Sequence, residues 1–234
     1  SQETNQDTAA DFTLKSSFSS SGGSISVIAA DTITQTFAAN EDANLDEQGD
    51  INVSSGSGSI DLYAADSISM ADGTLTQTAA GNIRLQSGGS IALSEIMAES
   101  ESGDQTISLV AGTYISDNDS SDDVDLTAGN LRIEAGSYVG SGDNHIETLV
   151  QTMSARTGGG LFVTETNSVS IDKLVQFTAN RVNSEGSALV VEATTDAAQE
   201  DLIVDGGDLV LQTKDGFVSV DGGDDTKGIS ATGN

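Results

Sequence analysis

The stretch GNIRLQSGGSIAL at residues 81–93 decides the fold of this chain. It contains the same short pattern twice: glycine, a small polar residue, and two aliphatic residues separated by one position. In an extended strand, alternate side chains point to the same face. Ile83 and Leu85 therefore share one face, as do Ile91 and Leu93, and the preceding Gly, Asn and Ser residues supply turns. The pattern predicts two short strands joined by a tight corner.

The same pattern returns along most of the chain. Further copies are GGSISV at 22–27, GDINV at 49–53, GSIDL at 58–62, GNLRI at 129–133 and GGDLVL at 206–211. Equivalent aliphatic residues form tracks, and the first two tracks keep a nearly constant spacing from member to member. The first track is Ile60, Ile83, Ile107 and Leu131; the second is Ile68, Ile91, Ile115, Val139 and Val163; a third, less regular track is Val27, Ile51, Leu75, Met97, Val124 and Leu149.

This fixed period predicts an all-β fold: a right-handed parallel β-helix, that is, a three-sided β-solenoid with about 23–24 residues per coil. Each strand would pair in parallel with its counterpart one coil above and below, so that the tracks form inward ladders. The chain has no proline, which agrees with strands paired on both sides because proline cannot donate to a ladder. A helical repeat needs apolar residues at 3.6 spacing, and a β-sandwich does not predict a fixed period.

The regularity divides the chain into three parts. Residues 1–20 are expected to form a polar N-terminal lead or cap, residues 21–163 the regular β-solenoid, and residues 164–234 a less regular continuation of it. Alternating aliphatic pairs persist in the last part with uneven spacing, which indicates coils of a different size or inserted loops. Residues 117–123 (DNDSSDD) are expected to be another inserted loop, because the third track is stretched there.

The charge of the chain excludes several partners. Its 8 Lys and Arg against 37 Asp and Glu give a formal net charge of -29. Recognition of nucleic acid needs a basic face, so no nucleic acid is expected as a partner. No stretch reaches the ~18 to 20 apolar residues of a membrane helix, so no membrane insertion is expected. The absence of cysteine removes disulfides and thiolate metal sites.

The most specific stretch is LTAGNLRIEAGSYVGSGDNHIETLVQTMSARTGGGLFVTETNSVSI, residues 126–171. It resembles the recurring unit of the giant β-strand-repeat proteins of bacterial surfaces, related to filamentous haemagglutinin-type adhesins: LTA-x-N-L-x-L, a glycine-bearing loop, L-E-T, then G-G-x-x-V-T-E. Where the family pattern carries Asn-Pro before L-E-T, this chain has Asn144-His145. The resemblance implies a segment of a much longer exported protein, extracellular or at the bacterial cell surface, that serves as a stalk, an adhesin or part of a coat.

The sequence predicts no catalytic residue. Parallel β-helix enzymes that act on polysaccharides need clustered carboxylates with a neighbouring base. Arg84 and Arg132 share one outward position two coils apart, which indicates repetition, and neighbouring carboxylates are their expected partners. His145 is the only histidine and lies in a polar loop. We expect a non-enzymatic structural or adhesive rod segment; the alternative is a carbohydrate-binding or carbohydrate-active β-helix protein.

Acidic clusters raise the question of whether the chain binds calcium as a cofactor. Carboxylates in flexible loops are typical calcium ligands, but the 117–123 loop has neither the glycine nor the closing glutamate of the usual calcium loop. DGGD at 205–208 and DGGDD at 221–225 resemble calcium-binding repeats but are isolated. A solvated acidic turn is the favoured interpretation of all three. The alternative is a calcium site formed by Asp117, Asp119, Asp122 and Asp123.

Two kinds of partner are predicted. The end coils of a solenoid expose unpaired strand edges, which favours head-to-tail association with neighbouring segments or copies of the same protein. Surface glycans are the second kind, with Tyr63, Tyr114 and Tyr138 as the aromatic residues to inspect. Two Thr-x-Thr copies, at 34–36 and 76–78, are too few to favour an ice-binding face.

Overall fold

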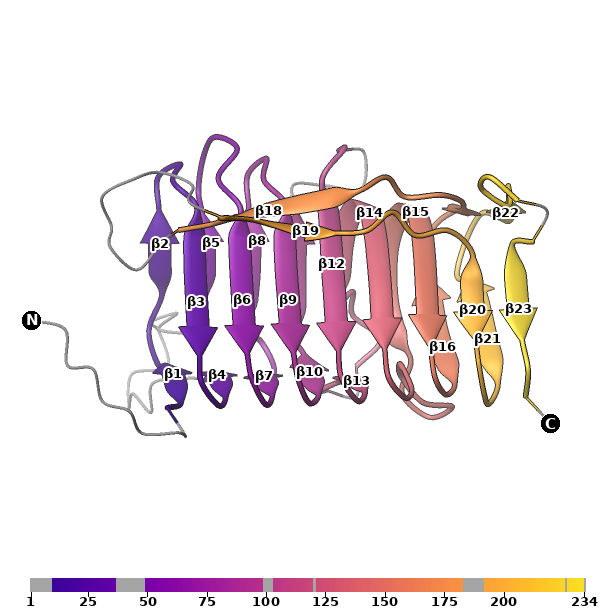
Figure 1. The fold of residues 1–234 in the computed structure, drawn as a ribbon, viewed down its shortest axis with the longest axis horizontal. Helices are drawn as coiled ribbons and strands as arrows, with labels where there is room; N and C mark the ends of the chain where they lie inside the picture. Colours follow the sequence, from indigo (N-terminus) through magenta and orange to yellow (C-terminus); the bar gives the residue numbers. More distant parts are fainter. Residues whose placement is uncertain are drawn as a thin grey trace, which may run out of the picture.

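The structure, a computed structural model, describes residues 10–36, 49–98, 103–119, 121–182, 192–225 and 227–233. Within these residues the chain forms strands β1 to β23 and no helix, so this part holds no helix that is long and apolar enough to cross a membrane. Every pair of named strands except β18–β19 is parallel. Figure 1 shows the strands side by side along one long axis, with β1 and β23 at opposite ends. The all-β, parallel fold class is thus confirmed and is consistent with a β-solenoid.

Three rows of parallel strands, called here the first, second and third ladders, make up most of the fold. The first ladder contains β3 (Ile25–Ala29), β6 (Ile60–Ala64), β9 (Ile83–Ser87), β12 (Thr106–Ala111), β14 (Leu126–Ala135), β15 (Ile146–Thr157), β20 (Leu202–Val204) and β23 (Ile229–Ala231). The second contains β1 (Phe12–Leu14), β4 (Ile33–Gln35), β7 (Ile68–Met70), β10 (Ile91–Leu93) and β13 (Ile115–Asp117), and continues through Val139 to β16 (Leu161–Glu165) and β21 (Leu209–Thr213). The third contains β2 (Phe18–Ser20), β5 (Ile51–Val53), β8 (Leu75–Thr78), β11 (Glu95–Ala98), parts of β14 and β15, β17 (Val169–Ile171) and β22 (Val218–Val220).

The register of the first ladder confirms the first predicted track. Ile60 pairs with Ile83, Ile83 with Ile107, and Ile107 with Leu131, so each member of the track lies beside the next. The ladders also begin within the predicted N-terminal lead, since β1 pairs with β4 and β2 with β5. Residues 1–9 lie outside the described part.

The second track is confirmed as far as Val139 and is wrong at its last member. Val139 pairs with Leu161, whereas Val163 pairs with Ile146. Leu161 and Val163 are separated by a single residue, whereas their partners Val139 and Ile146 enclose a longer segment. Residues 140–145 therefore form an insertion that shifts the register.

The third predicted track is wrong by one position over part of its length. At β8 and β11 the buried partners are Thr76 and Ile96, and Val27 belongs to β3 of the first ladder. Ile51 is buried as expected, but its partner is Thr76. A shift of one residue turns every side chain of a strand to the opposite face. The remaining aliphatic members of the track are partly exposed: Leu75, Met97, Val124 and Leu149.

This error has a physical cause, because polar side chains occupy interior positions of the third ladder. The fully buried Thr76 donates to Gln35 Oε1 at 3.2 Å, and Gln35 donates to the carbonyl of Gly49 at 2.8 Å. Thr148 donates to Glu165 Oε2 at 2.6 Å, and both residues are fully buried. Buried polar groups are tolerated where they are hydrogen-bonded in this way. A search for aliphatic residues alone cannot find such positions.

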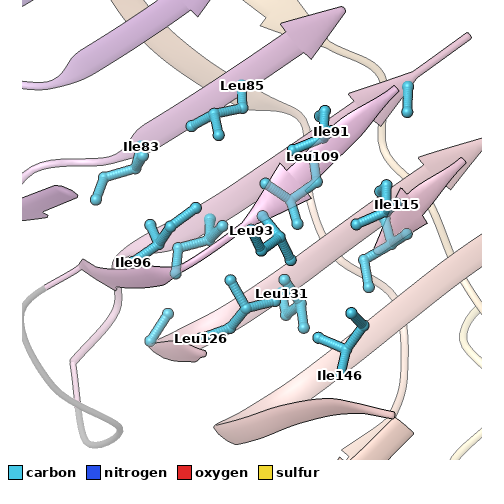
Figure 2. Close-up of a cluster of buried hydrophobic side chains, with 14 of the residues drawn as sticks. Ile83, Leu85, Ile91, Leu93, Ile96, Leu109, Ile115, Leu126, Leu131 and Ile146 are labelled. Carbon is cyan, nitrogen blue, oxygen red and sulfur yellow. The ribbon is translucent and has the colours of Figure 1, made fainter. Parts of the chain in front are cut away.

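The core is a continuous cluster of aliphatic side chains between the ladders. Figure 2 shows Ile83 and Leu85 from β9, Ile91 and Leu93 from β10, and Ile96 from β11 converging on it. All five are fully buried. Each such side chain contributes roughly 1.5–3 kcal/mol by leaving water. The stretch at 81–93 therefore supplies two sides of the core, as its pattern predicts.

An antiparallel pair of strands crosses the outside of the first ladder. β18 (Phe177–Arg181) and β19 (Glu192–Asp196) lie between β17 and β20 in the sequence and run across the ladder strands (Figure 1). We call the described residues 172–182 and 192–201 the strap. It is bound to the ladder along its length: the Val182 N–H donates to Ser26, and Gln199 donates to the Ile133 carbonyl. This insertion explains the uneven spacing of the aliphatic pairs after residue 163.

Charged side chains are buried between the strap and the first ladder. Asp61, Arg84, Ser108 and Arg132 occupy successive positions of one row, and each is at most 6% exposed. Arg84 donates from Nε and Nη2 to the two oxygens of Asp196, both at 2.9 Å.

Further contacts complete this charged row. Arg84 Nη1 lies 3.4 Å from Asp61 Oδ1, and Arg181 Nε lies 2.5 Å from Asp61 Oδ2. Burial alone would raise the pKa of Asp196, but the hydrogen bonds and charge of Arg84 lower it. The prediction that Arg84 and Arg132 pair with neighbouring carboxylates is thus confirmed. Arg84 pairs with Asp61, and Arg132 pairs with Glu134 at 2.8 Å.

Candidate metal centre

Three buried carboxylates meet where the second and third ladders adjoin. Asp117 is the last residue of β13 and pairs with Leu93, so it takes an interior position that leucine fills in the preceding strand. Asp125 directly precedes β14, and Glu147 is the second residue of β15. The three residues are 8%, 4% and 5% exposed. We call Asp117, Asp125 and Glu147 the carboxylate cluster.

The backbone holds the members of the cluster close together. One carboxylate oxygen from each residue lies within 4.8 Å of one from each of the others. Asp125 Oδ2 accepts the Glu147 N–H at 2.8 Å, and the Asp125 N–H donates to the Glu147 carbonyl at 3.0 Å. Asp117 Oδ1 accepts the Asp119 N–H at 3.0 Å, which turns the chain into the loop.

The cluster lacks a compensating positive charge. Among the described residues, no Lys or Arg forms an ion pair with any of the three carboxylates. Lys214 lowers the pKa of Glu147 through its charge, but its Nζ donates to the carbonyl of Asp122, at 2.7 Å, and not to the cluster. Two buried oxygens, Asp117 Oδ2 and Glu147 Oε2, have no hydrogen-bond partner. Unpaired buried charge is costly, so this arrangement needs either protons or a cation.

Burial raises the pKa of every member, and repulsion within the cluster adds to the rise for Asp125 and Glu147. Burial raises the pKa of Asp125 to about 8, and the charges of Asp117 and Glu147 contribute to the rise against the lowering effect of its hydrogen bond. Burial and the charge of Asp117 raise the pKa of Glu147 to about 7. The pKa of Asp117 is raised chiefly by burial as well.

These pKa values predict how stability depends on pH when no divalent cation is present. The pKa of Asp125 is 3.8 in the unfolded chain and about 8 in the folded one, so the folded chain binds the proton more tightly between these values. Stability should therefore fall as pH rises from about 4 to about 8. Melting temperatures in a chelator at several pH values measure this, and Asp125→Asn should flatten the decline. A decline that persists unchanged in Asp125→Asn, as expected for the exposed control Asp66→Asn, would contradict the assignment.

Two open hollows flank the cluster. One, of about 390 Å³, is lined by Glu147 together with His145, Thr164, Gln212 and Lys214. The other, of about 320 Å³, is lined by Asp125 together with loop residues that include Asp119 and Asp123. Water or a small ion can therefore approach the cluster from either side.

The structure places the four predicted calcium ligands in two different settings. Asp117 lies in the carboxylate cluster, while the other three lie on the loop beside it. Asp119 Oδ1 accepts the Ser121 N–H at 2.6 Å, and Asp123 Oδ2 accepts from the Ser121 hydroxyl at 3.2 Å. Asp122 is exposed. The predicted inserted loop is confirmed for the described residues 118–119 and 121–123, which lie outside any strand, whereas its first residue, Asp117, belongs to β13.

Sequence reasoning missed Asp125 and Glu147. The sequence nevertheless contains a signal for both residues. Asp125 directly precedes the strand pattern LTAGNL, and Glu147 interrupts the strand pattern IETLV. A charged residue inside such a pattern is a candidate for a buried site, because its neighbours are committed to the core.

A second acidic group lies near the end of the strap. Oxygens of Glu200, Asp201 and Asp225 lie within 4.8 Å of one another. Asp201 is 3% exposed, has a backbone φ of 70°, and has a buried Oδ1 without a partner. Asp225 belongs to the DGGDD stretch. From the DGGD stretch, Asp205 instead faces Arg156 at 3.5 Å.

The tyrosines predicted as candidates for glycan contacts interact with other side chains of the protein. Tyr114 and Tyr138 stack on each other with ring centroids 4.9 Å apart, and Tyr138 is 40% exposed. Tyr63 lies under Arg181, whose guanidinium carbon is 5.5 Å from the ring centroid. His145 contacts the Thr164 hydroxyl at 2.8 Å and is half-buried rather than fully exposed.

Comparisons with protein-family models, with curated proteins and with solved structures found no match to this chain.

Proposed function

We propose that the chain is a non-enzymatic rod segment of a large secreted or cell-surface bacterial protein, with a structural or adhesive role. The proposal includes a finer architecture, in which the three ladders belong to one right-handed, three-sided β-solenoid of about 23–24 residues per coil. Its support is the register of the first ladder, where Ile60, Ile83, Ile107 and Leu131 pair in turn over four consecutive strands. A stack of this kind extends a rigid shape along one axis, which suits a stalk.

The observation that carries the proposal is the state of the last strand layer. Within the described residues, β21, β22 and β23 each pair with one strand only. Exposed apolar side chains accompany these edges: Phe217 is 66%, Val220 49% and Ile229 43% exposed. At the opposite end, β2 also has one partner and Phe18 is 43% exposed. Such ends pair readily with another strand layer. The proposed occupant is a second copy of the chain, docked head to tail.

This contact predicts association that depends on concentration. Sedimentation equilibrium of the chain should give a weight-average mass that rises with concentration at about 0.15 M salt, where exposed charges are screened beyond about 8 Å. Replacing Val220 and Ile229 together by lysine should abolish the rise, because it places charge on the apolar end. The matched control is Val175→Lys, at a residue 78% exposed on the strap. A strictly monomeric wild type, or an equal loss in the control, would refute head-to-tail docking.

A specific observation also supports the second candidate, a carbohydrate-active protein. Glu147, with its raised pKa, borders a hollow that also contains His145 and Lys214. A carboxyl group that keeps its proton near neutral pH is suited to general acid catalysis. Glu147 is only 5% exposed, however, and a general acid must contact the glycosidic oxygen of its substrate. The burial of Glu147 therefore favours the structural rod over the enzyme. A polysaccharide-cleavage screen with wild type and Glu147→Gln, together with a glycan array, separates the two. Cleavage that the substitution removes would replace the rod proposal with the enzyme.

A further inference from the structure

We propose that Asp117, Asp125 and Glu147 bind one divalent cation, preferably Ca²⁺, which ties the two ends of the loop before β14 to β15 in the next strand layer. This inference does not depend on the proposed rod function. It differs from the four-aspartate loop site considered from the sequence, with which it shares only Asp117.

The first argument is charge compensation. Three carboxylate residues, each at most 8% exposed, face one another without an ion pair to Lys or Arg in the described part of the chain. By contrast, the buried carboxylates Asp61 and Asp196 are both paired with Arg84. A buried carboxylate without such a partner is normally protonated, or it coordinates a metal.

The second argument is the pair of unpartnered oxygens. Asp117 Oδ2 and Glu147 Oε2 are buried and accept no hydrogen bond, although both belong to carboxylates of the cluster. Leaving a buried acceptor unsatisfied costs about 1–3 kcal/mol, and more for a charged group. A cation bound among the three carboxylates would satisfy both oxygens at once.

The third argument is size. Calcium takes oxygen ligands at about 2.3–2.6 Å, so ligands on opposite sides of the ion lie roughly 4.6–5.2 Å apart. The cluster has one oxygen from each residue within 4.8 Å of the others, which this ion can span. Magnesium holds its ligands at about 2.0–2.1 Å in a strict octahedron, whereas calcium accepts a flexible geometry, so a cluster fixed by three strands suits calcium better. Calcium needs six to eight ligands, and the hollows on both sides give water access to the remaining positions.

The position of the cluster gives the ion a structural role. Asp117 ends β13, Asp125 directly precedes β14, and Glu147 lies in the next layer, in β15. The described residues of the loop between β13 and β14 are also anchored by hydrogen bonds, among them Asn144 donating to the Asp119 carbonyl at 2.7 Å and Lys214 donating to the Asp122 carbonyl at 2.7 Å. An ion shared by Asp117 and Asp125 would close this loop at its two ends.

Calorimetric titration of the chelator-treated chain with Ca²⁺ tests the proposal. Wild type is expected to bind Ca²⁺ and to melt at a higher temperature with it, with a smaller shift for Mg²⁺ at the same concentration. Glu147→Gln should lose both the heat and the shift. Without Ca²⁺ it should melt at or above the wild-type temperature, because it removes an unpaired buried charge. If millimolar Ca²⁺ gives wild type neither heat nor a shift, the proposal is wrong.

Two further variants keep the result unambiguous. Asp225→Asn alters the acidic group of Glu200, Asp201 and Asp225 and should leave Ca²⁺ binding at the carboxylate cluster intact. Any bound Ca²⁺ that this variant loses would therefore belong to the second group. Asp117→Asn is a second substitution in the cluster, with far-ultraviolet circular dichroism as the check on folding. If folded Glu147→Gln and Asp117→Asn bind Ca²⁺ as wild type does, and Asp225→Asn does not, the ion belongs to the other group and the proposal is overturned.

Discussion

Arg84→Ala is expected to be among the most destabilising single substitutions in the chain, with a loss of about 3–5 kcal/mol. Arg84 is 4% exposed and neutralises two carboxylates, Asp61 at 3.4 Å and Asp196 at 2.9 Å. Removing the guanidinium leaves the strap residue Asp196 buried against the first ladder, with the Ser108 hydroxyl as its remaining hydrogen-bond donor in place of Arg84. Thermal and denaturant unfolding measure the loss. Limited proteolysis should show faster cleavage in the strap, because a buried ion pair that binds it to the ladder is gone.

The matched control is Arg156→Ala. Arg156 and Asp205 form an ion pair at 3.5 Å with side chains 59% and 54% exposed. Exposed pairs contribute about 0–1 kcal/mol, so this variant should unfold nearly as wild type does. The double variant Arg84→Ala/Asp196→Ala should be more stable than Arg84→Ala alone, because it removes the stranded charge. Equal effects of Arg84→Ala and Arg156→Ala would show that the strap does not depend on the buried pair.

The first ladder could be predicted because its period is set by the aliphatic side chains of the first track, all of which are buried in the core. Ile60, Ile83 and Ile107 recur at nearly fixed spacing, and their register follows that spacing. The third ladder could not be predicted in the same way, because Thr76 and Thr148 fill its interior and satisfy their hydroxyls on buried partners. Hydrophobicity marks the core only where the interior is apolar.

A search for local sequence patterns could not predict the contacts of the strap or the carboxylate cluster, because both join residues that lie far apart in the sequence. Arg84 and Asp196 lie 112 residues apart, and no periodic rule connects a ladder row to an inserted strand pair. Asp117 was found through the acidic loop that follows it. Asp125 and Glu147 reach the same place through the stacking of β14 on β15, which appears in the register and not in any contiguous motif.

Gly112→Ala should cause the other large effect, because glycine at this corner is a requirement of stacking. A Cβ on Gly112 would overlap the carbonyl oxygen of Gly88. Gly136 meets Gly112, and Gly158 meets Gly136, in the same way. The row recurs with nearly the period of the aliphatic tracks, so each glycine lies one strand layer above the previous one. Parallel strands sit only ~4.8 Å apart, and the corner backbones leave no room for a methyl group between them.

The expected cost of Gly112→Ala is about 3 kcal/mol, at the upper end of what an overpacked methyl group costs, because rigid backbone rather than a side chain must move. Gly142→Ala is the matched control: its Cβ would meet only the Phe162 ring, at an ordinary 3.8 Å. Melting temperature and denaturant midpoint should drop for the first variant and stay near wild type for the second. If Gly112→Ala unfolds as Gly142→Ala does, the corners are looser than the close approach implies. In that case glycine at this spacing would reflect turn preference alone. A loss of stability in Gly112→Ala but not in Gly142→Ala would instead show that close contact between consecutive strand layers requires glycine at this corner.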